Sequence, residues 1–190
     1  MSSPPDKPRR DRTAEILKAA FELLQEQPYA EITIENIAAR AQVGKPTVYR
    51  RWPSKGALAL DALIGHLPTV DFPDSGDVAQ DLRQWLYNIA DSLSGPFGPM
   101  ITGLVGAAQH DPDLAQAWNE RMFQPVRAAY RPHLSAVQDA GRLRQADPDV
   151  LADMLAGPIW FRVLMTGTVP DRERIDAIVE VATGFPAPRN

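Results

Sequence analysis

Apolar residues recur every three to four positions along most of the chain, which is the spacing of one face of an α-helix. In the N-terminal third this spacing predicts four helices, over about 13–27, 34–41, 45–52 and 55–67. Beyond a loop rich in Pro, Asp and Gly, it predicts five helical stretches, over about 78–93, 99–110, 111–140, 148–167 and 172–184. The sequence contains no convincing alternation of apolar and polar residues of the kind that marks a strand. The pattern therefore predicts an all-α fold.

Residues that favour helix ends stand at several of these boundaries. Thr33 and Ser54 each precede a predicted helix, where a hydroxyl can accept a hydrogen bond from a free backbone N–H. Pro46 falls in the first turn of its helix, where a missing N–H costs little. Pro125 and Pro132 are expected to kink or divide the longest helical stretch. The local signals thus agree with the periodicity.

The segment from Ile32 to Lys55 combines two short predicted helices with a dense set of hydrogen-bond donors. A three-residue turn containing Gly44 joins the two helices, as in a helix-turn-helix. In that motif the second helix lies in the major groove of DNA, with its N-terminal residues at the base edges. Apolar side chains can lock the two helices against the first one: Ile37, Ala38, Ala41, Val43, Val48 and Trp52. The donors can then project elsewhere: Lys45, Thr47, Tyr49, Arg50 and Arg51.

Positive charge is concentrated at the N-terminal end of the chain. Residues 1–60 hold 10 Lys and Arg against 7 Asp and Glu, a net charge of +3, and they include all four lysines. Residues 61–190 hold 10 against 17, a net charge of −7. Thr33 and Lys55 stand at helix starts, where backbone N–H groups favour a phosphate. The segment is therefore interpreted as a reader of double-stranded DNA, joined to an acidic body.

Other classes of protein lack their characteristic residues here. With no cysteine, the chain can form no disulfide, thiolate nucleophile or Cys-ligated zinc site. His66, His110 and His133 are isolated and lack the spacing of metal ligands, so no metal is expected. No phosphate-binding loop, dinucleotide fingerprint or nucleophile elbow occurs, so neither an enzyme nor a cofactor is predicted. No apolar run approaches the roughly 18 residues of a membrane span, and a cytoplasmic protein is expected.

The stretch TIENIAARAQVGKPTVYRRWPSKGAL resembles the DNA-binding domain of the tetracycline-repressor (TetR) family. The resemblance covers about residues 10–65, and DPDVLADMLAGPIWFRVLMTG is similar to the helical regulatory domain of one branch of that family. It implies a homodimer that usually represses transcription and that a small ligand in the C-terminal domain usually releases from DNA. The expected domains are a flexible arm, a helix-turn-helix domain, and a regulatory and dimerisation domain, over 1–9, 10–54 and 55–190.

The resemblance assigns DNA contacts residue by residue. Phosphate-contacting positions of the family are matched by Thr33, Tyr49 and Lys55. Positions that reach base edges, or the backbone beside them, are matched by Lys45, Pro46 and Thr47. For Tyr49, a place in the core is the alternative.

Several arginines stand where the roles differ among relatives. Arg50 occupies a position where many members have His, and Arg51 one where many have an aromatic residue. Arg50 could read guanine through two hydrogen bonds, but either arginine could instead hold a phosphate. Arg9, Arg10 and Arg12 precede the first helix, where some relatives have a basic arm that touches the minor groove. A solubilising tail is the alternative for these three residues.

Aromatic and Met residues of the C-terminal part could line a ligand cavity: Trp85, Phe97, Met100, Trp118, Met122, Phe123, Trp160 and Phe161. Simple core packing is the alternative for each of them, and a lining of this kind favours a hydrophobic or amphipathic effector. Dimerisation is expected through the last two helices, with candidate seam residues Leu151, Met154, Leu155, Leu164, Ile175, Ile178 and Val179.

The sequence thus predicts a homodimeric transcriptional regulator, a repressor released from a palindromic operator by a small hydrophobic ligand. One alternative is a DNA-binding dimer whose C-terminal domain binds no small ligand and serves assembly or partner recruitment. The other is an enzyme with a fused DNA-binding head, for which the sequence offers no catalytic residues.

Overall fold

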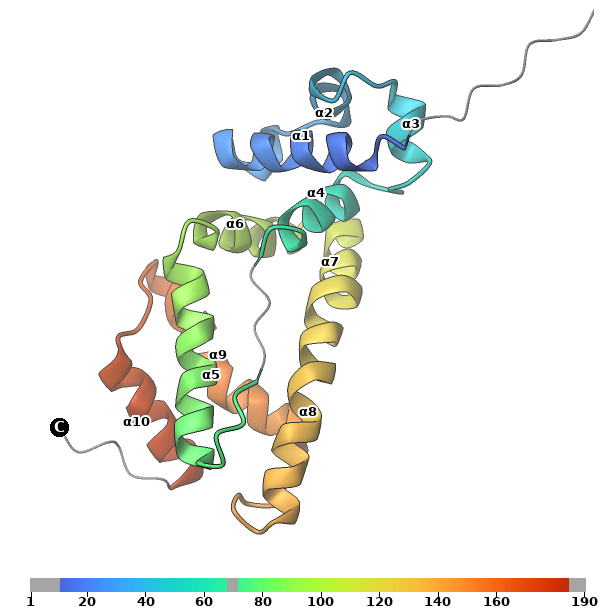
Figure 1. The fold of residues 1–190 in the computed structure, drawn as a ribbon. Coiled ribbons are helices and arrows are strands. Elements are labelled where there is room, and N and C mark those ends of the chain that lie inside the picture. The colour runs from blue at the N-terminus through green and yellow to red at the C-terminus, as the bar shows by residue number, and fades with distance from the viewer. Residues whose placement is uncertain (1–10, 68–71, 185–190) are drawn as a thin grey trace, which may run out of the picture. The chain divides into compact units, whose positions relative to one another are not determined.

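The computed structural model describes residues 11–67 and 72–184, and every regular element within them is helical (Figure 1). The prediction of an all-α fold is confirmed. The arm expected at 1–9, together with Arg9 and Arg10, lies outside the described residues. Of the helices that the structure describes, none combines the length and the apolar character that crossing a bilayer requires.

The chain divides into two compact units, and each is described by itself. Of the described residues, the N-terminal unit comprises 11–66 and 103–118, and the C-terminal unit comprises 67, 72–102 and 119–184. In the N-terminal unit lie α1 (Thr13–Glu26), the 3-10 helix η1 (Tyr29–Glu31), α2 (Ile34–Arg40), α3 (Lys45–Tyr49), α4 (Lys55–Ile64) and α7 (Pro112–Trp118). The division falls within α6 (Gly98–Ala108). In the C-terminal unit lie α5 (Val78–Ser94), the π-helix η2 (Asn119–Phe123), α8 (Gln124–Asp139), α9 (Pro148–Thr166) and α10 (Arg172–Thr183).

The starts of α2 and α4 are each fixed by a local hydrogen bond. Thr33 Oγ1 accepts from the backbone N–H of Asn36 at 3.2 Å, and the Asn36 side chain accepts from the N–H of Thr33 at 2.8 Å. This reciprocal cap satisfies two backbone donors that a helix start leaves free. Ser54 Oγ accepts from the N–H of Ala57 at 3.1 Å and caps α4 in the same way. Both caps predicted from the sequence are confirmed.

The predicted apolar face of the helix-turn-helix is also confirmed. Ile37, Ala38, Ala41, Val48 and Trp52 are all buried and Val43 is half-buried, which joins α2 and α3 to the core of the N-terminal unit. In that core α1, with Ile16 and Ala20 buried, packs against α4, whose apolar residues are buried along nearly its whole length. The expected domain boundary before residue 55 therefore differs from the packing, because α4 belongs with the N-terminal helices.

Gly56 marks the closest approach between α4 and α7. A Cβ atom at position 56 would lie only 2.8 Å from both the Cα and the Cβ of Leu114. Since no other residue type lacks this atom, the glycine is what allows α7 to lie directly on α4. Residues 103–118 thereby join the N-terminal unit, although they follow α5 in the sequence.

The long stretch predicted at 111–140 is interrupted by π-helical residues rather than divided at both prolines. α7 ends at Trp118 and is followed by the π-helix η2, and Pro125 is then the second residue of α8. The helical backbone continues without a break from Pro112 to Asp139, and Pro125 follows the π-helical residues, where the α-helical hydrogen-bond pattern is already interrupted. Pro132 lies inside α8 and does not divide it.

A polar group of side chains links α5 to α10 within the C-terminal unit. The Arg83 guanidinium lies 3.3 Å from the Asp176 carboxylate, and the Tyr87 hydroxyl donates a hydrogen bond to the same carboxylate. Burial, followed by the hydrogen bond to Asp176, raises the pKa of Tyr87 to about 12. The contact between α5, α9 and α10 also has an apolar part, in which Leu86 and Val179 are fully buried.

Candidate nucleic-acid interface

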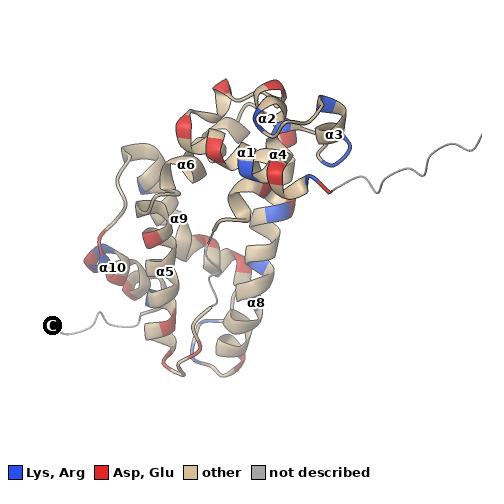
Figure 2. Ribbon diagram, turned by 45° about the horizontal axis from the view of Figure 1, so that its top comes forward, with Lys and Arg blue, Asp and Glu red and all other residues tan. Residues whose placement is uncertain are grey.

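The N-terminal unit holds α3 by one side and exposes the other. Of the residues of α3, Val48 alone is buried, whereas Lys45, Pro46 and Tyr49 are exposed and Thr47 is half-buried. Tyr49 is 53% exposed, so the alternative of a core aromatic does not apply. Lys and Arg positions, blue on the ribbon, lie on and beside this helix (Figure 2). The arrangement presents hydrogen-bond donors on a short helix, as a groove-reading element does.

Thr33 and Lys55 stand at the starts of α2 and α4, so all eight predicted DNA contacts belong to this unit. They differ in what holds their side chains. The Thr33 hydroxyl is already used as a cap acceptor, which leaves its own proton for another partner. The four cations among the eight residues, Lys45, Arg50, Arg51 and Lys55, differ in the partners that their side chains contact.

Lys45 forms an ion pair across the turn of the motif. Its Nζ lies 2.8 Å from Glu35 Oε1, and the two side chains are 53% and 60% exposed. The hydrogen bond between them raises the pKa of Lys45 and lowers that of Glu35. Sequence reasoning missed Glu35. The acidic residue in the first turn of α2 is visible in the sequence, but nothing there places it beside Lys45.

Arg51 is tied to the start of α1. Its Nη2 lies 2.7 Å from Asp11 Oδ1, and the same carboxylate accepts from the backbone N–H and the hydroxyl of Thr13. Arg12 donates from Nη2 to the carbonyl of Ala41 at 2.9 Å, which fastens the first helix to the turn of the motif. Of the three arginines considered for a basic arm, Arg12 is thus anchored within the unit.

Lys55 is turned inward instead of extending from the surface. Its Nζ donates to the carbonyl oxygen of Tyr29 at 3.1 Å and lies 4.0 Å from the centre of the Tyr29 ring. Burial lowers the pKa of Lys55. The Tyr29 hydroxyl in turn donates to Asp111 Oδ2 at 2.8 Å, and Asp111 Oδ1 caps α7 by accepting from the N–H of Leu114 at 3.0 Å. A phosphate contact by Lys55 would require its ammonium to leave this site.

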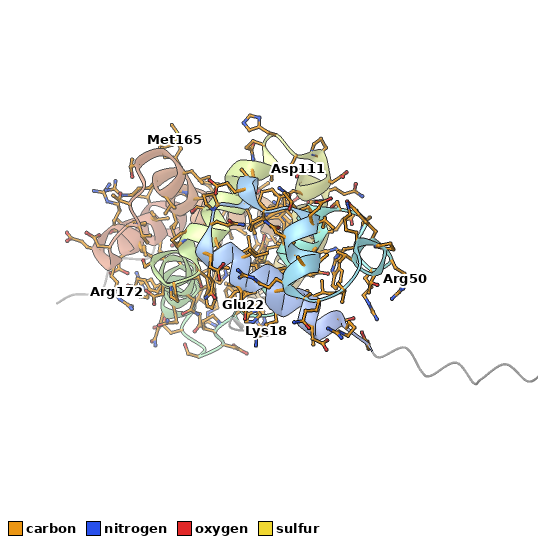
Figure 3. The ribbon with its side chains drawn as sticks, turned by 90° about the horizontal axis from the view of Figure 1, so that it is seen from above. Lys18, Glu22, Arg50, Asp111, Met165 and Arg172 are labelled. Carbon is orange, nitrogen blue, oxygen red and sulfur yellow. The ribbon has the colours of Figure 1, made fainter. Side chains whose placement is uncertain are left out.

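Arg50 is the cation that remains available. Within residues 11–67 and 72–184, no hydrogen bond or ion pair to its guanidinium is found. Figure 3 shows Arg50 on the outer side of α3, pointing away from α1. A planar group with five donors in this position can pair with O6 and N7 of guanine, or with a phosphate.

The predicted ligand residues differ in how far they are buried. Trp85 and Met100 are buried and Phe97, Trp118, Met122 and Trp160 are half-buried, whereas Phe123 and Phe161 are exposed. Phe161, at 67% exposure, lies on the surface of its unit, because it points away from the face of α9 that carries Leu155 and Ile159. The C-terminal unit contains a cavity of about 280 Å³ between the start of α5 and the end of α8. Among its described lining residues are Phe72, Leu82, His133 and Val137, and none of the eight predicted ones.

Part of the aromatic set serves the core. The ring centre of Trp85 lies 5.7 Å from that of Phe72 and 5.2 Å from that of Tyr130.

In the part of the chain that the structure describes, no group of three or more His, Asp or Glu side chains could hold a metal ion.

Comparisons with known proteins agree with this geometry. Residues 16–62 match the bacterial regulatory proteins of the tetR family, and residues 72–182 match the tetracyclin repressor-like C-terminal domain. The chain is 36% identical over 173 residues to the uncharacterized HTH-type transcriptional regulator YdeS of Bacillus subtilis, covering 88% of this chain and 86% of that protein. It is 24% identical over 163 residues to the DNA-binding transcriptional repressor TetR of Mycobacteroides abscessus, covering 84% and 86% of the two chains.

The crystal structure of the TetR family transcription regulator SCO0332 has the same fold, with a TM-score of 0.73 and 36% identity over 93% of this chain and 99% of that chain. The first family match lies on α1 to α4, which include the exposed α3, and the second runs from α5 into α10, with α7 included. These are the two domains of a DNA-binding transcriptional regulator, not those of an enzyme. The chain therefore belongs to the TetR family of transcriptional regulators.

Proposed function

We propose that the protein is a homodimeric repressor that a small hydrophobic ligand releases from a palindromic operator. The observation that carries the proposal is the exposed side of α3, where Lys45, Tyr49 and Arg50 project from a helix anchored by Val48. Eight residues are assigned to DNA: Thr33, Lys45, Pro46, Thr47, Tyr49, Arg50, Arg51 and Lys55. The relative from Mycobacteroides abscessus, which is named as a repressor, supports the direction of regulation.

An apolar face on α9 supports the homodimer. Its exposed large residues recur on one side of the helix: Val150, Met154, Phe161, Leu164 and Met165 (Met165 is labelled in Figure 3). Monomeric proteins rarely expose a continuous apolar stripe of this kind. Four of the candidate seam residues, Leu151, Leu155, Ile175 and Val179, are instead buried within the protomer. The proposed dimer contact therefore consists of the outer face of α9, with Met154 and Leu164 in it.

The ligand part of the proposal has a specific rival. A ligand would act by favouring a state of the dimer in which the two copies of α3 no longer match successive major grooves. The aromatic and Met residues of the C-terminal unit support a hydrophobic effector. A DNA-binding dimer without a small ligand is favoured by the cavity beside α5 and α8, because none of the predicted residues lines it. A screen of hydrophobic compounds that yields neither thermal shift nor tryptophan quenching would support that rival.

Selection of bound duplexes from a random pool tests the proposed function directly. We expect an inverted repeat whose half-site centres lie about 10 bp apart, or at a multiple of that distance, because a two-fold dimer presents α3 twice. A hydrophobic effector should then lower the affinity for the selected duplex. A single asymmetric site, occupied by one subunit at a time, would contradict the dimeric arrangement.

The substitution Arg50→Ala is expected to weaken binding to the selected duplex by about 1–3 kcal/mol and to relax the preference at one position in each half-site. Lys55→Ala should instead weaken selected and scrambled duplexes alike, and flatten the slope of log K against log salt by about one for each phosphate that no longer meets a lysine. Titrations of both variants at several salt concentrations separate the two effects. Lys18→Ala, which removes an exposed cation from α1, is the control and should change neither quantity. If Arg50→Ala only flattens the salt slope, Arg50 holds a phosphate and Lys45, Pro46 and Thr47 carry the readout.

A further inference from the structure

The position of Glu35 is not explained by the residues assigned so far. Glu35 is the second residue of α2 and Lys45 is the first of α3, and their side chains meet at 2.8 Å beside the exposed side of the groove helix. Both side chains are more than half exposed. Exposed ion pairs contribute little to the stability of a fold. Stability therefore gives only a small reason for a carboxylate at a surface that meets a polyanion, since an acidic residue in the first turn of a helix also contributes only modestly through the helix dipole.

A carboxylate can accept from two groups on the major-groove edge of DNA, the N4 amino group of cytosine and the N6 amino group of adenine. Phosphate oxygens repel it, whereas the N4 amino group of cytosine donates a hydrogen bond to it. The guanine paired with that cytosine presents O6 and N7, which accept from an ammonium. One G·C pair thus displays two acceptors followed by a donor. The Lys45–Glu35 pair presents a donor beside an acceptor, which is the complementary order.

We propose that Lys45 and Glu35 together read one G·C base pair in each half-site. The Lys45 ammonium donates to guanine O6 or N7, and a Glu35 carboxylate oxygen accepts from cytosine N4. The inference rests on the proposed function, because it requires α3 to lie in the major groove. The ion pair exists before DNA is bound, so the two side chains lose less conformational freedom on binding than two unrestrained side chains would.

The pair also discriminates against wrong sequences. At an A·T pair the carboxylate can accept from adenine N6, but adenine offers the Lys45 ammonium only N7, whereas guanine offers it both O6 and N7. On DNA of unrelated sequence the carboxylate lies near phosphates without a donor. Glu35 therefore lowers the affinity for unrelated DNA and restrains Lys45 from serving as a general phosphate contact.

The test compares Glu35→Ala, Lys45→Ala and the double variant on the selected duplex, on a scrambled duplex, and on duplexes with each base pair replaced symmetrically. For Glu35→Ala we expect the ratio of affinities for selected and scrambled DNA to fall about tenfold or more. The missing preference should map to one G·C pair in each half-site, and Lys45→Ala should abolish the preference at the same pair. The double variant should lose no more of the preference at that pair than either single variant does, because both substitutions remove the same readout.

Glu26→Ala is the matched control. It removes one negative charge and an exposed ion pair, with Arg40 at 2.6 Å, and should leave the ratio and the base preferences unchanged. The inference is overturned if Glu35→Ala behaves like Glu26→Ala, or if the two substitutions alter different base pairs. The experiment distinguishes a failure of this inference from a failure of the proposed function. If the unaltered protein selects no sequence at all, the proposed function fails; if it selects an inverted repeat and Glu35→Ala has no effect on it, only this inference fails.

Discussion

Replacing Phe161 by glutamate is expected to convert the protein into a folded monomer of 20.9 kDa that no longer binds its inverted repeat with high affinity. Phe161 is 67% exposed on α9, so the substitution leaves the core of the protomer intact. Burying a phenylalanine side chain contributes about 1.5–3 kcal/mol, and a two-fold contact contains two copies. Losing both raises the dissociation constant of the dimer by about 10²- to 10⁴-fold. The two carboxylates add a desolvation cost in the same direction.

Sedimentation at several protein concentrations measures this effect, and circular dichroism checks that the helices remain. Val126→Glu is the matched control, because it places the same charge on an exposed apolar residue of α8, outside the proposed dimer contact. It should leave the dimer intact. Two outcomes contradict the proposed contact: a dimer that survives Phe161→Glu, or a dimer that Val126→Glu dissociates equally well.

Removing the carboxylate of Asp176 is expected to lower the free energy of unfolding by about 3 kcal/mol. Arg83 and Asp176 side chains are only 9% and 16% exposed, so Asp176→Ala leaves a guanidinium nearly buried without this counter-charge. Breaking one partner of a buried pair costs about 3–5 kcal/mol, and the remaining exposure of Asp176 places this pair at the lower end. The Tyr87 hydroxyl loses its acceptor in the same substitution.

Urea unfolding at a fixed protein concentration measures the change, since the stability of a dimer depends on that concentration. The pair of Arg172 and Asp91 provides the control, because it joins the same two helices at 3.7 Å with both side chains largely exposed. Asp91→Ala should therefore cost less than about 1 kcal/mol. Equal effects of the two substitutions would show that burial does not set the strength of the Asp176 contact.

The helices and the DNA-reading segment are predictable from the sequence because their signals are local. The caps at Thr33 and Ser54 lie within three residues of the N–H groups that they accept from, and the apolar face around Val48 repeats within a few turns. Nothing local connects Tyr29 with Asp111, which are 82 positions apart. The inward placement of Lys55 and the association of α7 with α4 depend on such distant contacts, and the sequence could not provide them.

The faces of α9 are not predictable for a different reason. Apolar residues occupy nearly every side of this helix, so its periodicity does not separate a face that packs in the protomer from one that is free for a second copy. Leu155 and Phe161 look equivalent in the sequence, yet the first is fully buried and the second is exposed. For this reason the sequence suggests that Phe161 lines a ligand cavity and that Leu155 lies in the dimer contact. In the structure Phe161 is exposed and Leu155 is buried within the protomer.

The contact between Gly56 and Leu114 has a mechanical consequence. A Cβ atom at position 56 would lie 2.8 Å from the Cα of Leu114. At this point the backbone of α4 therefore lies against α7 with no side chain of α4 between them. A side chain in a seam can absorb a small displacement by changing its rotamer, but position 56 has no side chain that could do so. A shift of α7 is therefore passed on as a shift of the first turn of α4, where Lys55 begins the helix, before any repacking of the core can dissipate it.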